Sequence, residues 1–414
     1  MVTADERASI AEARDRLTDD AVSFLQEMIR TPSINPPGDY QAIADVLSDQ
    51  FEDFGWEAET VRTPDSVLAE LGLDPSYPRL NVLGYVARGE GPTIALNAHL
   101  DTVPVDESES WDHDPFGGEI DDGRVYGRGA MDSKGRIASY SLAGRILDRS
   151  GLLPEDATIV VAITCDEETG GAAGAGYVTE SGSLRPDYAI VEGAVDRIWR
   201  AASGILRPRV TVTGKASHAG VDPDSGANAV VGAARIVNAL DKHATNLAGR
   251  SSEIPDVDHP TCTPATIEGG IKANVIPPEC SFLTDMRVPP EANLDAAEAE
   301  FRDVVDGVTL PAGASASVDI TQRSQPYIFE EDAVHVQALK ENAEAVRGES
   351  VPVVGTRGST DARYFAPAGA KCVNYGPGDG RSNPHGADEN VAIDQVADVG
   401  AIIAGTILDV TRGA

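Results

Sequence analysis

The 414-residue chain has few basic residues, few cysteines and few aromatic side chains. It carries 33 lysine and arginine residues, of which six are lysine, against 67 aspartate and glutamate residues, and its net charge is -34. Because nucleic acid and anionic membranes attract proteins through a basic face, neither is an expected partner. A hydrophobic content of 41% argues against disorder, so we expect the acidic residues to cover a folded surface.

An acidic surface of this density repels itself unless salt screens its charges. At 1 M salt the Debye length falls to about 3 Å, which removes most of that repulsion. We therefore predict a halophilic source for the protein. Loss of the folded signal on dialysis into low salt would support this prediction, and full stability without salt would contradict it.

The four cysteines are widely separated and form no CxxC pair. In a chain of this length they are expected to be reduced and partly buried, as in a cytoplasmic protein. Residues 1–20 are polar and helical in pattern, and no apolar run is long enough to span a bilayer, so neither a signal peptide nor a membrane helix is expected. The length itself predicts two domains.

The most informative stretch begins with residues 93–101, TIALNAHLD, a predicted buried strand that ends in His99 and Asp101. In an extended chain residues i and i+2 point to the same side, so Asp101 can orient the imidazole of His99. After a long polar loop, Asp132 precedes a predicted helix, and its two carboxylate oxygens could bridge two metal ions. An isolated histidine is more often a core residue than a ligand, so a metal site needs further ligands.

Two later predicted strands, IVVAIT and DYAIV, also end in acidic residues. These acids are Asp166, Glu167, Glu168 and Glu192. They could be surface charge alone, but the buried strands place at least one carboxylate at the edge of the core. That position is unfavourable without a metal or a shared proton. Three strands that each end in a candidate ligand therefore predict a metal site.

The order of predicted strands and helices indicates an α/β fold, for which we expect a central mixed sheet flanked by helices. Residues 205–322 alternate strands and helices in a different pattern, which predicts an inserted α+β domain. The expected division is therefore 1–204 and 323–414 for the larger domain, with 205–322 between its two parts.

Seven motifs, taken together, resemble the M20 metallopeptidase and amidohydrolase family. They are HLDTVP, GRGAMDSKG, DEETGG, IVEG, GKASHAG, GGIKANVIPP with DMR, and NPHGADENV. The family includes acetylornithine deacetylase, succinyl-diaminopimelate desuccinylase, aminoacylase and carboxypeptidase G, and the resemblance covers nearly the whole chain in the family's order. No GxSxG, P-loop or dinucleotide fingerprint occurs, which disfavours serine and nucleotide-dependent enzymes.

The resemblance implies a catalytic domain with two zinc ions per subunit, for which cobalt could substitute. Asp132 would bridge the ions, His99 and Glu192 would bind one, and Glu168 and His385 would bind the other. The other two implied roles are Glu167 as the general base and Asp101 as the residue that orients His99. The resemblance also implies that the Asp132–Ser133 peptide bond is commonly cis.

The same resemblance makes the inserted domain a ferredoxin-like dimerisation and lid domain. In a homodimer, His218 would reach the neighbouring subunit's site and donate to the scissile carbonyl oxygen. The expected substrate contacts are Asn274, Arg287, Gly358, Ser359 and Thr360. A planar guanidinium such as that of Arg287 suits a substrate carboxylate. Arg357 could add a second anionic contact or have a structural or solvated role.

The predicted function is zinc-dependent hydrolysis of the amide bond of an N-acyl amino acid, as in a deacetylase or desuccinylase of amino-acid biosynthesis. The alternatives are a di- or carboxypeptidase acting on a small peptide, or a non-catalytic metal- or ligand-binding relative. The acyl group and the amino acid stay open.

Overall fold

The computed structural model describes residues 1–106 and 110–413. The chain forms two compact units, one of Met1–Arg200, Phe329–Val353 and Thr360–Ala414 and the other of Ala201–Ile328 and Val354–Ser359. Whether these units fold as separate domains with the predicted boundaries stays a prediction.

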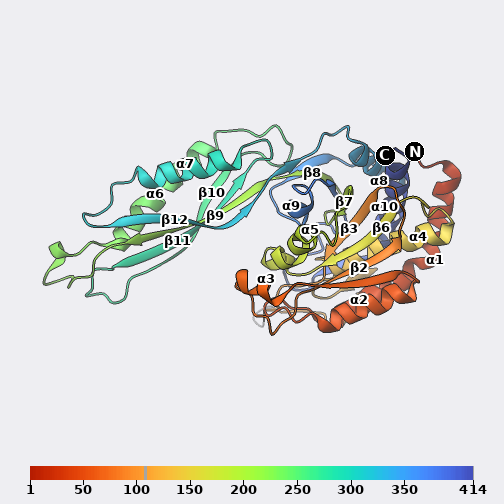
Figure 1. Cartoon of the computed structure of the whole chain (residues 1–414), viewed down its shortest axis with the longest axis horizontal. Helices are drawn as coiled ribbons and strands as arrows, with labels where there is room; N and C mark the ends of the chain where they lie inside the picture. Colours follow the sequence, from red (N-terminus) through yellow and green to blue (C-terminus); the bar gives the residue numbers. More distant parts are fainter. Residues whose placement is uncertain (107–109, 414) are drawn as a thin grey trace. The chain divides into compact units, whose positions relative to one another are not determined.

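The first unit is built on a mixed sheet (Figure 1). Its strands are β1 (Glu57–Arg62), β2 (Leu80–Ala87), β6 (Thr158–Thr164), β3 (Thr93–His99), β7 (Tyr188–Val191), β15 (Lys371–Asn374) and β8 (Ile198–Ala202), in that spatial order. The sheet also takes in β13 (Tyr327–Ile328) and β14 (Val353–Thr356), which pair with β8. Strands β6, β3, β7 and β15 run parallel to one another, whereas the pairs β1–β2, β2–β6, β15–β8 and β8–β13 are antiparallel. This arrangement confirms the predicted mixed sheet.

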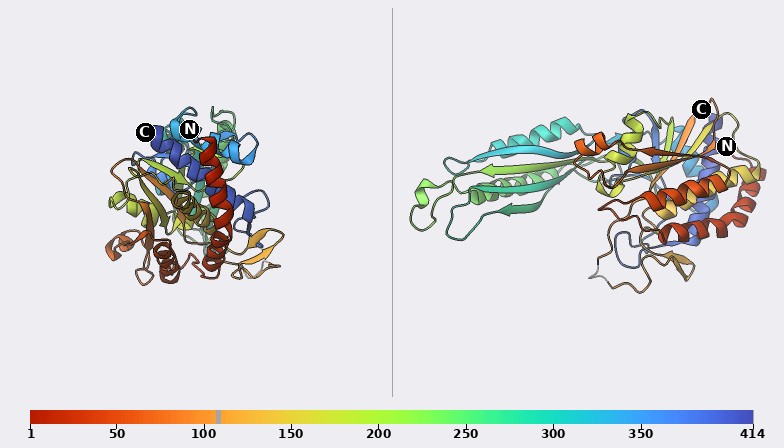
Figure 2. Two further views of the ribbon diagram at one scale, coloured as in Figure 1. Left: turned by 90° about the vertical axis from the view of Figure 1, so that its right-hand side faces the viewer. Right: turned by 60° about the horizontal axis from the view of Figure 1, so that its bottom comes forward.

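Helices flank this sheet (Figure 1). They are α1 (Ala4–Ile29), α2 (Gln41–Asp53), α3 (Asp65–Glu70), α4 (Lys134–Ser150), α5 (Tyr177–Glu180), α8 (Val334–Arg347), α9 (Ala362–Phe365) and α10 (Ile393–Gly413). Helix α4 packs on β3 and β6, α1 and α10 pack against α4, and α2 packs on β1 and β2. Figure 2 shows α1 and α10 side by side, and a salt bridge between Glu6 and Arg412 joins them at 2.7 Å.

The long polar loop before Asp132 contains more structure than its sequence indicates. Strands β4 (Glu119–Asp121) and β5 (Arg124–Tyr126) pair there and join β16 (Asn390–Ala392) in a small sheet. Segments of three residues are too short to give a recognisable period. Residues 107–109 of this loop lie outside the described residues.

The polar sequence around His113 in the same loop predicts a solvated histidine, and the structure shows that this prediction is wrong. Its ring stacks on Tyr126 with 3.8 Å between the ring centroids. Its side chain is 19% exposed and lies 3.4 Å from a carboxylate oxygen of Asp388.

The second unit contains a four-stranded antiparallel sheet in the order β10 (Thr261–Gly269), β11 (Glu279–Val288), β9 (Gly204–Thr213) and β12 (Ser315–Ser324). Helices α6 (Ala229–Leu247) and α7 (Leu294–Asp306) pack on this sheet and on each other. The side chains of Asn228 and Asn293 cap the two helices by accepting backbone N–H groups of the first turn. This is the α+β unit that the sequence predicts.

All four cysteines are free and buried. In the described part of the chain, no helix combines the length and the apolar character needed to cross a bilayer.

Candidate active site

Two groups of potential metal ligands meet in the first unit and share Asp132. In the first group, the Nε2 atom of His99, at the end of β3, lies 3.1 Å from Oδ1 of Asp132 and 3.4 Å from Oε2 of Glu192, which follows β7. The ligand atoms of these three residues all lie within 4.8 Å of one another. His99 and Glu192 are buried because they end strands of the core.

The second group uses the other oxygen of Asp132. Nε2 of His385 lies 3.2 Å from Oδ2 of Asp132 and 3.2 Å from Oε2 of Glu168. The side chain of His385 is 54% exposed, so this group is the more open of the two. The five side chains expected to bind metal are therefore brought together, in two groups that one carboxylate joins.

Two observations test whether these residues fit metal ions. Oε1 of Glu168 and Oε2 of Glu192 are buried without a hydrogen-bond partner. A buried carboxylate oxygen without a hydrogen-bond partner is unfavourable, and a bound cation would satisfy it. Imidazole nitrogens and carboxylate oxygens are also common zinc ligands. The residues present therefore fit a pair of divalent ions.

Asp101 connects both groups to the loop that follows β6. Its carboxylate accepts hydrogen bonds from the backbone N–H groups of Glu167, at 3.1 Å, and Glu168, at 3.2 Å. Nδ1 of His99 lies 2.9 Å from the main-chain oxygen of Asp101 and 3.4 Å from its carboxylate. Asp101 thus contacts His99 mainly through its backbone, and its carboxylate fixes the backbone of the two glutamates.

The three consecutive acids after β6 point in different directions. Asp166 turns into the core, where its carboxylate lies 2.7 Å from Nε of Arg79 and accepts a hydrogen bond from the hydroxyl group of Tyr40 at 2.5 Å. Its φ of 61° is in the left-handed region, which reverses the chain and directs the next residues elsewhere. Asn35 donates to both Asp166 and Asp101, at 3.1 and 3.2 Å.

Glu389 supports the bridging residue from outside the ligand groups. It accepts hydrogen bonds from the backbone N–H groups of Met131 and Asp132 at 3.0 and 2.9 Å, and it pairs with Arg128 at 2.8 Å. Arg128 in turn donates to the main-chain oxygen of His385 at 3.2 Å. Sequence reasoning missed Arg128, Glu389 and Asn35, although the first two lie in or beside the quoted motifs GRGAMDSKG and NPHGADENV.

Glu167 belongs to neither ligand group. Its Oε1 atom accepts a hydrogen bond from Nη2 of Arg363 at 3.1 Å, and its side chain is 13% exposed. Burial raises the pKa of Glu167 well above its usual range, and the positive charge of Arg363 opposes this shift. A carboxylate with a raised pKa binds a proton more readily near neutral pH, as a general base requires.

The charges of the site also act on the ligands. Burial disfavours ionised Asp132, but Arg136, His385 and His99 together hold its pKa well below the usual range. Burial raises the pKa of Glu192 to about 7, although His99 and Arg136 oppose the shift. Hydrogen bonds to Asp132 and Glu168 raise the pKa of His385 to about 10. The peptide bond between Asp132 and Ser133 is cis.

His218 and Asn274 lie side by side in the second unit. Both are exposed, His218 forms an isolated β-bridge with Val275, and the main-chain oxygen of Asn274 accepts the N–H of Ala219 at 2.9 Å. Nδ1 of His218 accepts backbone N–H groups at 3.2 and 3.1 Å. A neutral His218 therefore carries its proton on Nε2, which leaves that atom as a donor.

The other expected substrate residues are already engaged in the structure. Arg287 pairs with Asp285 at 2.7 Å and donates to the main-chain oxygen of Arg357 at 3.0 Å. Thr360 is buried and accepts a hydrogen bond from Asn374 at 2.8 Å. Arg357 itself donates to the main-chain oxygen of Val257 and to the carboxylate of Asp258. Beside it, Gly358 is exposed and Ser359 is half-buried.

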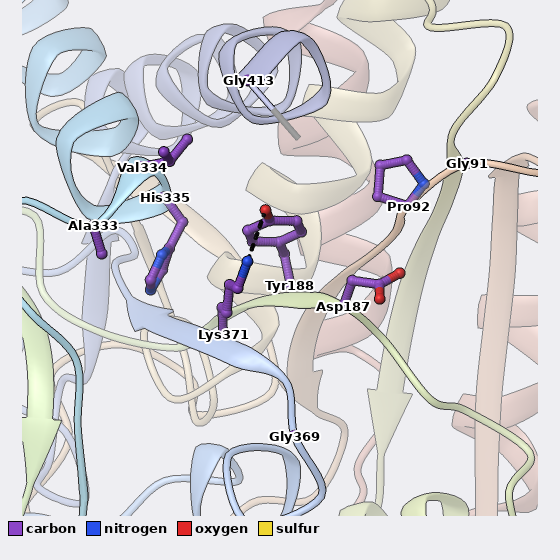
Figure 3. Close-up of a pocket in the computed structure, with 10 residues that line it drawn as sticks. All are labelled: Gly91, Pro92, Asp187, Tyr188, Ala333, Val334, His335, Gly369, Lys371 and Gly413. Atoms are coloured by element: carbon purple, nitrogen blue, oxygen red, sulfur yellow. Dashed lines mark hydrogen bonds between the residues drawn. The ribbon is translucent and has the colours of Figure 1, made fainter.

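The first unit also contains a hollow of about 760 Å³ at the amino ends of β7 and β15 (Figure 3). Tyr188, His335 and Lys371 line it, and Nζ of Lys371 lies 3.3 Å from the hydroxyl oxygen of Tyr188. Asp187, also in its lining, accepts the backbone N–H of Thr93 at 2.8 Å. This hollow contains no group of ligands of the kind found at the other end of the strands, as far as the described residues go.

Comparison with known proteins gives one family. Residues 95–409 match the sequence profile described as peptidase family M20/M25/M40. The chain is 29% identical over 398 residues to a succinyl-diaminopimelate desuccinylase of Parvibaculum lavamentivorans, covering 91% of this chain and 92% of that protein. It is 28% identical over 384 residues to aminoacylase-1 of Sus scrofa, covering 86% of each chain.

Among solved structures, human carnosine dipeptidase 1 is similar with a TM-score of 0.74 over 98% of this chain and 99% of that one. The sequence identity is 19%, so this likeness concerns the fold alone.

Proposed function

This chain belongs to peptidase family M20/M25/M40, whose members are metal-dependent hydrolases, and from that membership we propose that it hydrolyses the amide bond of an N-acyl amino acid. The observation that carries the proposal is the pair of ligand groups that share Asp132, with Glu167 beside them and outside both. The curated relatives, a desuccinylase and an aminoacylase, support an acylated amino acid as the substrate class.

We assign His99, Asp132 and Glu192 to one zinc ion and Asp132, Glu168 and His385 to the other. Bound ions would lower the pKa of a water molecule and polarise the scissile carbonyl group. Asp101 holds the two glutamates of the β6 loop by their backbone N–H groups. Arg128 and Glu389 hold the backbones of Asp132 and His385.

Glu167 is the proposed general base. Its carboxylate takes a proton from the attacking water while the water oxygen bonds to the carbonyl carbon. When the C–N bond breaks, Glu167 returns that proton to the leaving nitrogen. Burial keeps its proton affinity high, and the hydrogen bond from Arg363 fixes the position of Oε1.

His218 is proposed to donate its Nε2–H to the oxygen on which negative charge develops, and Asn274 and Arg287 to bind the substrate carboxylate. Gly358, Ser359 and Thr360 are proposed to line the substrate site. For Arg287 this requires the substrate to compete with Asp285, which already holds the guanidinium. The homodimer in which His218 would act on the neighbouring subunit belongs to the same proposal.

The decisive experiment is Glu167→Gln. Turnover should fall by about 100-fold to 10,000-fold, the usual contribution of a general base, while zinc content stays unchanged. Glu180→Gln, an exposed glutamate on α5 of the same unit, is the matched control and should keep full activity. A Glu167→Gln enzyme that retains wild-type turnover contradicts the assigned base.

A panel of acetylornithine, succinyl-diaminopimelate and a dipeptide, assayed in high salt with zinc and then with cobalt, tests the substrate class. Hydrolysis of an acylated amino acid supports the proposal. Activity confined to the dipeptide would favour a peptidase, and zinc binding without any hydrolysis would favour a binding protein.

A further inference from the structure

Arg136 is an arginine built into one of the two ligand groups. It lies in the first turn of α4, four residues after Asp132, and its side chain is 6% exposed. Its Nη1 atom lies 2.7 Å from Oδ1 of Asp132 and 3.6 Å from Oε2 of Glu192. Its Nη2 atom donates to the main-chain oxygen of Gly193 at 3.3 Å, which fixes the guanidinium in this place.

The second ligand group has no such cation. In the residues that the structure describes, Oδ2 of Asp132 and the carboxylate of Glu168 form ion pairs with His385 alone. No lysine or arginine pairs with these oxygens among the described residues, whereas the guanidinium of Arg136, which contacts the first group, is positively charged at any pH that a protein survives. The two groups therefore differ by one permanent positive charge.

We propose that Arg136 makes the two metal sites unequal, so that the ion held by His99, Asp132 and Glu192 binds more weakly than the ion held by Glu168 and His385. This inference rests on the proposed function, because it assumes the same ligands. Arg136 acts in it through the ligands Asp132 and Glu192 and is a positioning residue.

Two physical effects lead to this result. An ion in the first group must share Oδ1 of Asp132 with the N–H of Arg136, which reduces the electron density that the oxygen can give to the metal. The ion is also repelled by a fixed positive charge a few ångströms away in a buried site, where solvent screens charges poorly. Without metal, the same guanidinium neutralises two neighbouring carboxylates and so stabilises the empty site.

Arg136 is therefore expected to have opposite effects on metal binding and on stability. Arg136→Gln should raise the affinity for the weaker ion about tenfold or more and lower the unfolding midpoint of the metal-free protein. A residue that only supports packing would lower both. Arg136→Lys keeps the charge and should leave the weaker ion weak.

The test uses the whole protein, stripped of metal, with zinc as the probe. Equilibrium dialysis gives the two dissociation constants, and urea unfolding gives the stability without metal. The matched control is Arg145→Gln, which makes the same charge change on the same helix, where Arg145 pairs with Asp20 at 3.0 Å. This control should leave both zinc constants unchanged.

A second test, in a protein that already carries His385→Ala, shows which of the two metal sites Arg136 affects. His385→Ala removes a ligand of the other group, so the remaining ion must use His99, Asp132 and Glu192. Adding Arg136→Gln to this background should again tighten zinc about tenfold. If Arg136→Gln fails to fold without metal, zinc binding to His385→Ala alone gives the affinity of the first group in the presence of Arg136. Binding as tight as that of the stronger wild-type ion would then overturn the inference.

Equal affinities for the two ions in the wild type, or an Arg136→Gln protein that binds the second ion no tighter, would overturn the inference. In either case a Glu167→Gln enzyme that is inactive with zinc bound leaves the proposed function standing. Failure of the wild type to bind any zinc would overturn both.

Discussion

The two ends of the parallel strands in the first unit differ in chemistry although the same sheet builds both. At the carboxyl ends, five side chains form two groups. Within each group the imidazole nitrogens and carboxylate oxygens lie within 4.8 Å of one another. At the amino ends lies a hollow of about 760 Å³ whose titratable groups are already paired or held in the core. Volume alone does not make this hollow the better site, because carboxylate oxygens without hydrogen-bond partners, rather than volume, indicate a ligand.

Two buried histidines illustrate the same difference. His99 is 1% exposed and His335 is 3% exposed. Burial lowers the pKa of both, but the carboxylates around His99 outweigh burial and raise its pKa well above the usual value. For His335, burial dominates and lowers the pKa to about 4. The surroundings of a histidine, rather than its depth, decide whether it can serve in a charged site.

The largest expected effect is on stability. It distinguishes Asp166, a structural acid, from the adjacent Glu167 and Glu168, which are assigned to the active site. Asp166→Ala should lower the free energy of unfolding by about 3–5 kcal/mol, because it leaves the buried Arg79 without its partner. Urea unfolding measures the loss. Zinc content should remain at the wild-type value in the fraction that stays folded, and a loss of zinc at unchanged stability would place Asp166 among the ligands.

The next prediction compares the zinc affinities of two variants, each of which changes one carboxylate, Asp101 at the carboxyl ends of the parallel strands or Asp187 at their amino ends. Asp101→Asn should lower zinc affinity about 10-fold to 100-fold, because an amide has one acceptor oxygen for the two backbone N–H groups of the β6 loop and removes the negative charge beside Nδ1 of His99. Asp187→Asn is the control, since Asp187 also accepts a backbone N–H, that of Thr93 at the start of β3. Equal losses of zinc affinity in the two variants, measured by equilibrium dialysis, would contradict the comparison.

His335 should make stability depend on pH. Its pKa is about 4 when folded and near 6.5 when unfolded, so the unfolded chain binds the extra proton between these values. This contribution to stability is complete above pH 6.5 and is lost as the pH falls toward 4, about 2 kcal/mol of it by pH 5. His335→Gln should flatten the curve of unfolding free energy against pH in that window. An unchanged slope in His335→Gln would show that His335 is not the group responsible.

The smallest effect concerns the amino-end hollow itself. Lys371→Ala should change the free energy of unfolding by less than about 1 kcal/mol, because the ammonium group is exposed and contacts only the ring and hydroxyl group of Tyr188 among the described residues. Turnover and zinc content should equal those of the wild type. A clear loss of turnover would mean that Lys371 influences the metal-ligand groups at the carboxyl ends of the strands.

The sequence predicted most of the long elements, because strands β3 and β6 are continuous apolar runs and helices α2 and α6 have clear hydrophobic periods. It did not predict β4, β5 and α9, which are three or four residues long, or the short helix α3. Helix α10 was also missed, although its hydrophobic residues recur with a helical period as clear as that of α2.

The sequence by itself determined the family, the mixed α/β sheet and the residue types available for a metal site, since motif order and strand periodicity are local properties of the chain. Only the tertiary structure decided which of three adjacent acids enters the core, that Asp101 holds the backbone of two glutamates, and that Arg136 faces one ligand group and not the other. These features depend on distances between residues far apart in the chain or on backbone direction at a single residue, and neither is encoded in a local pattern.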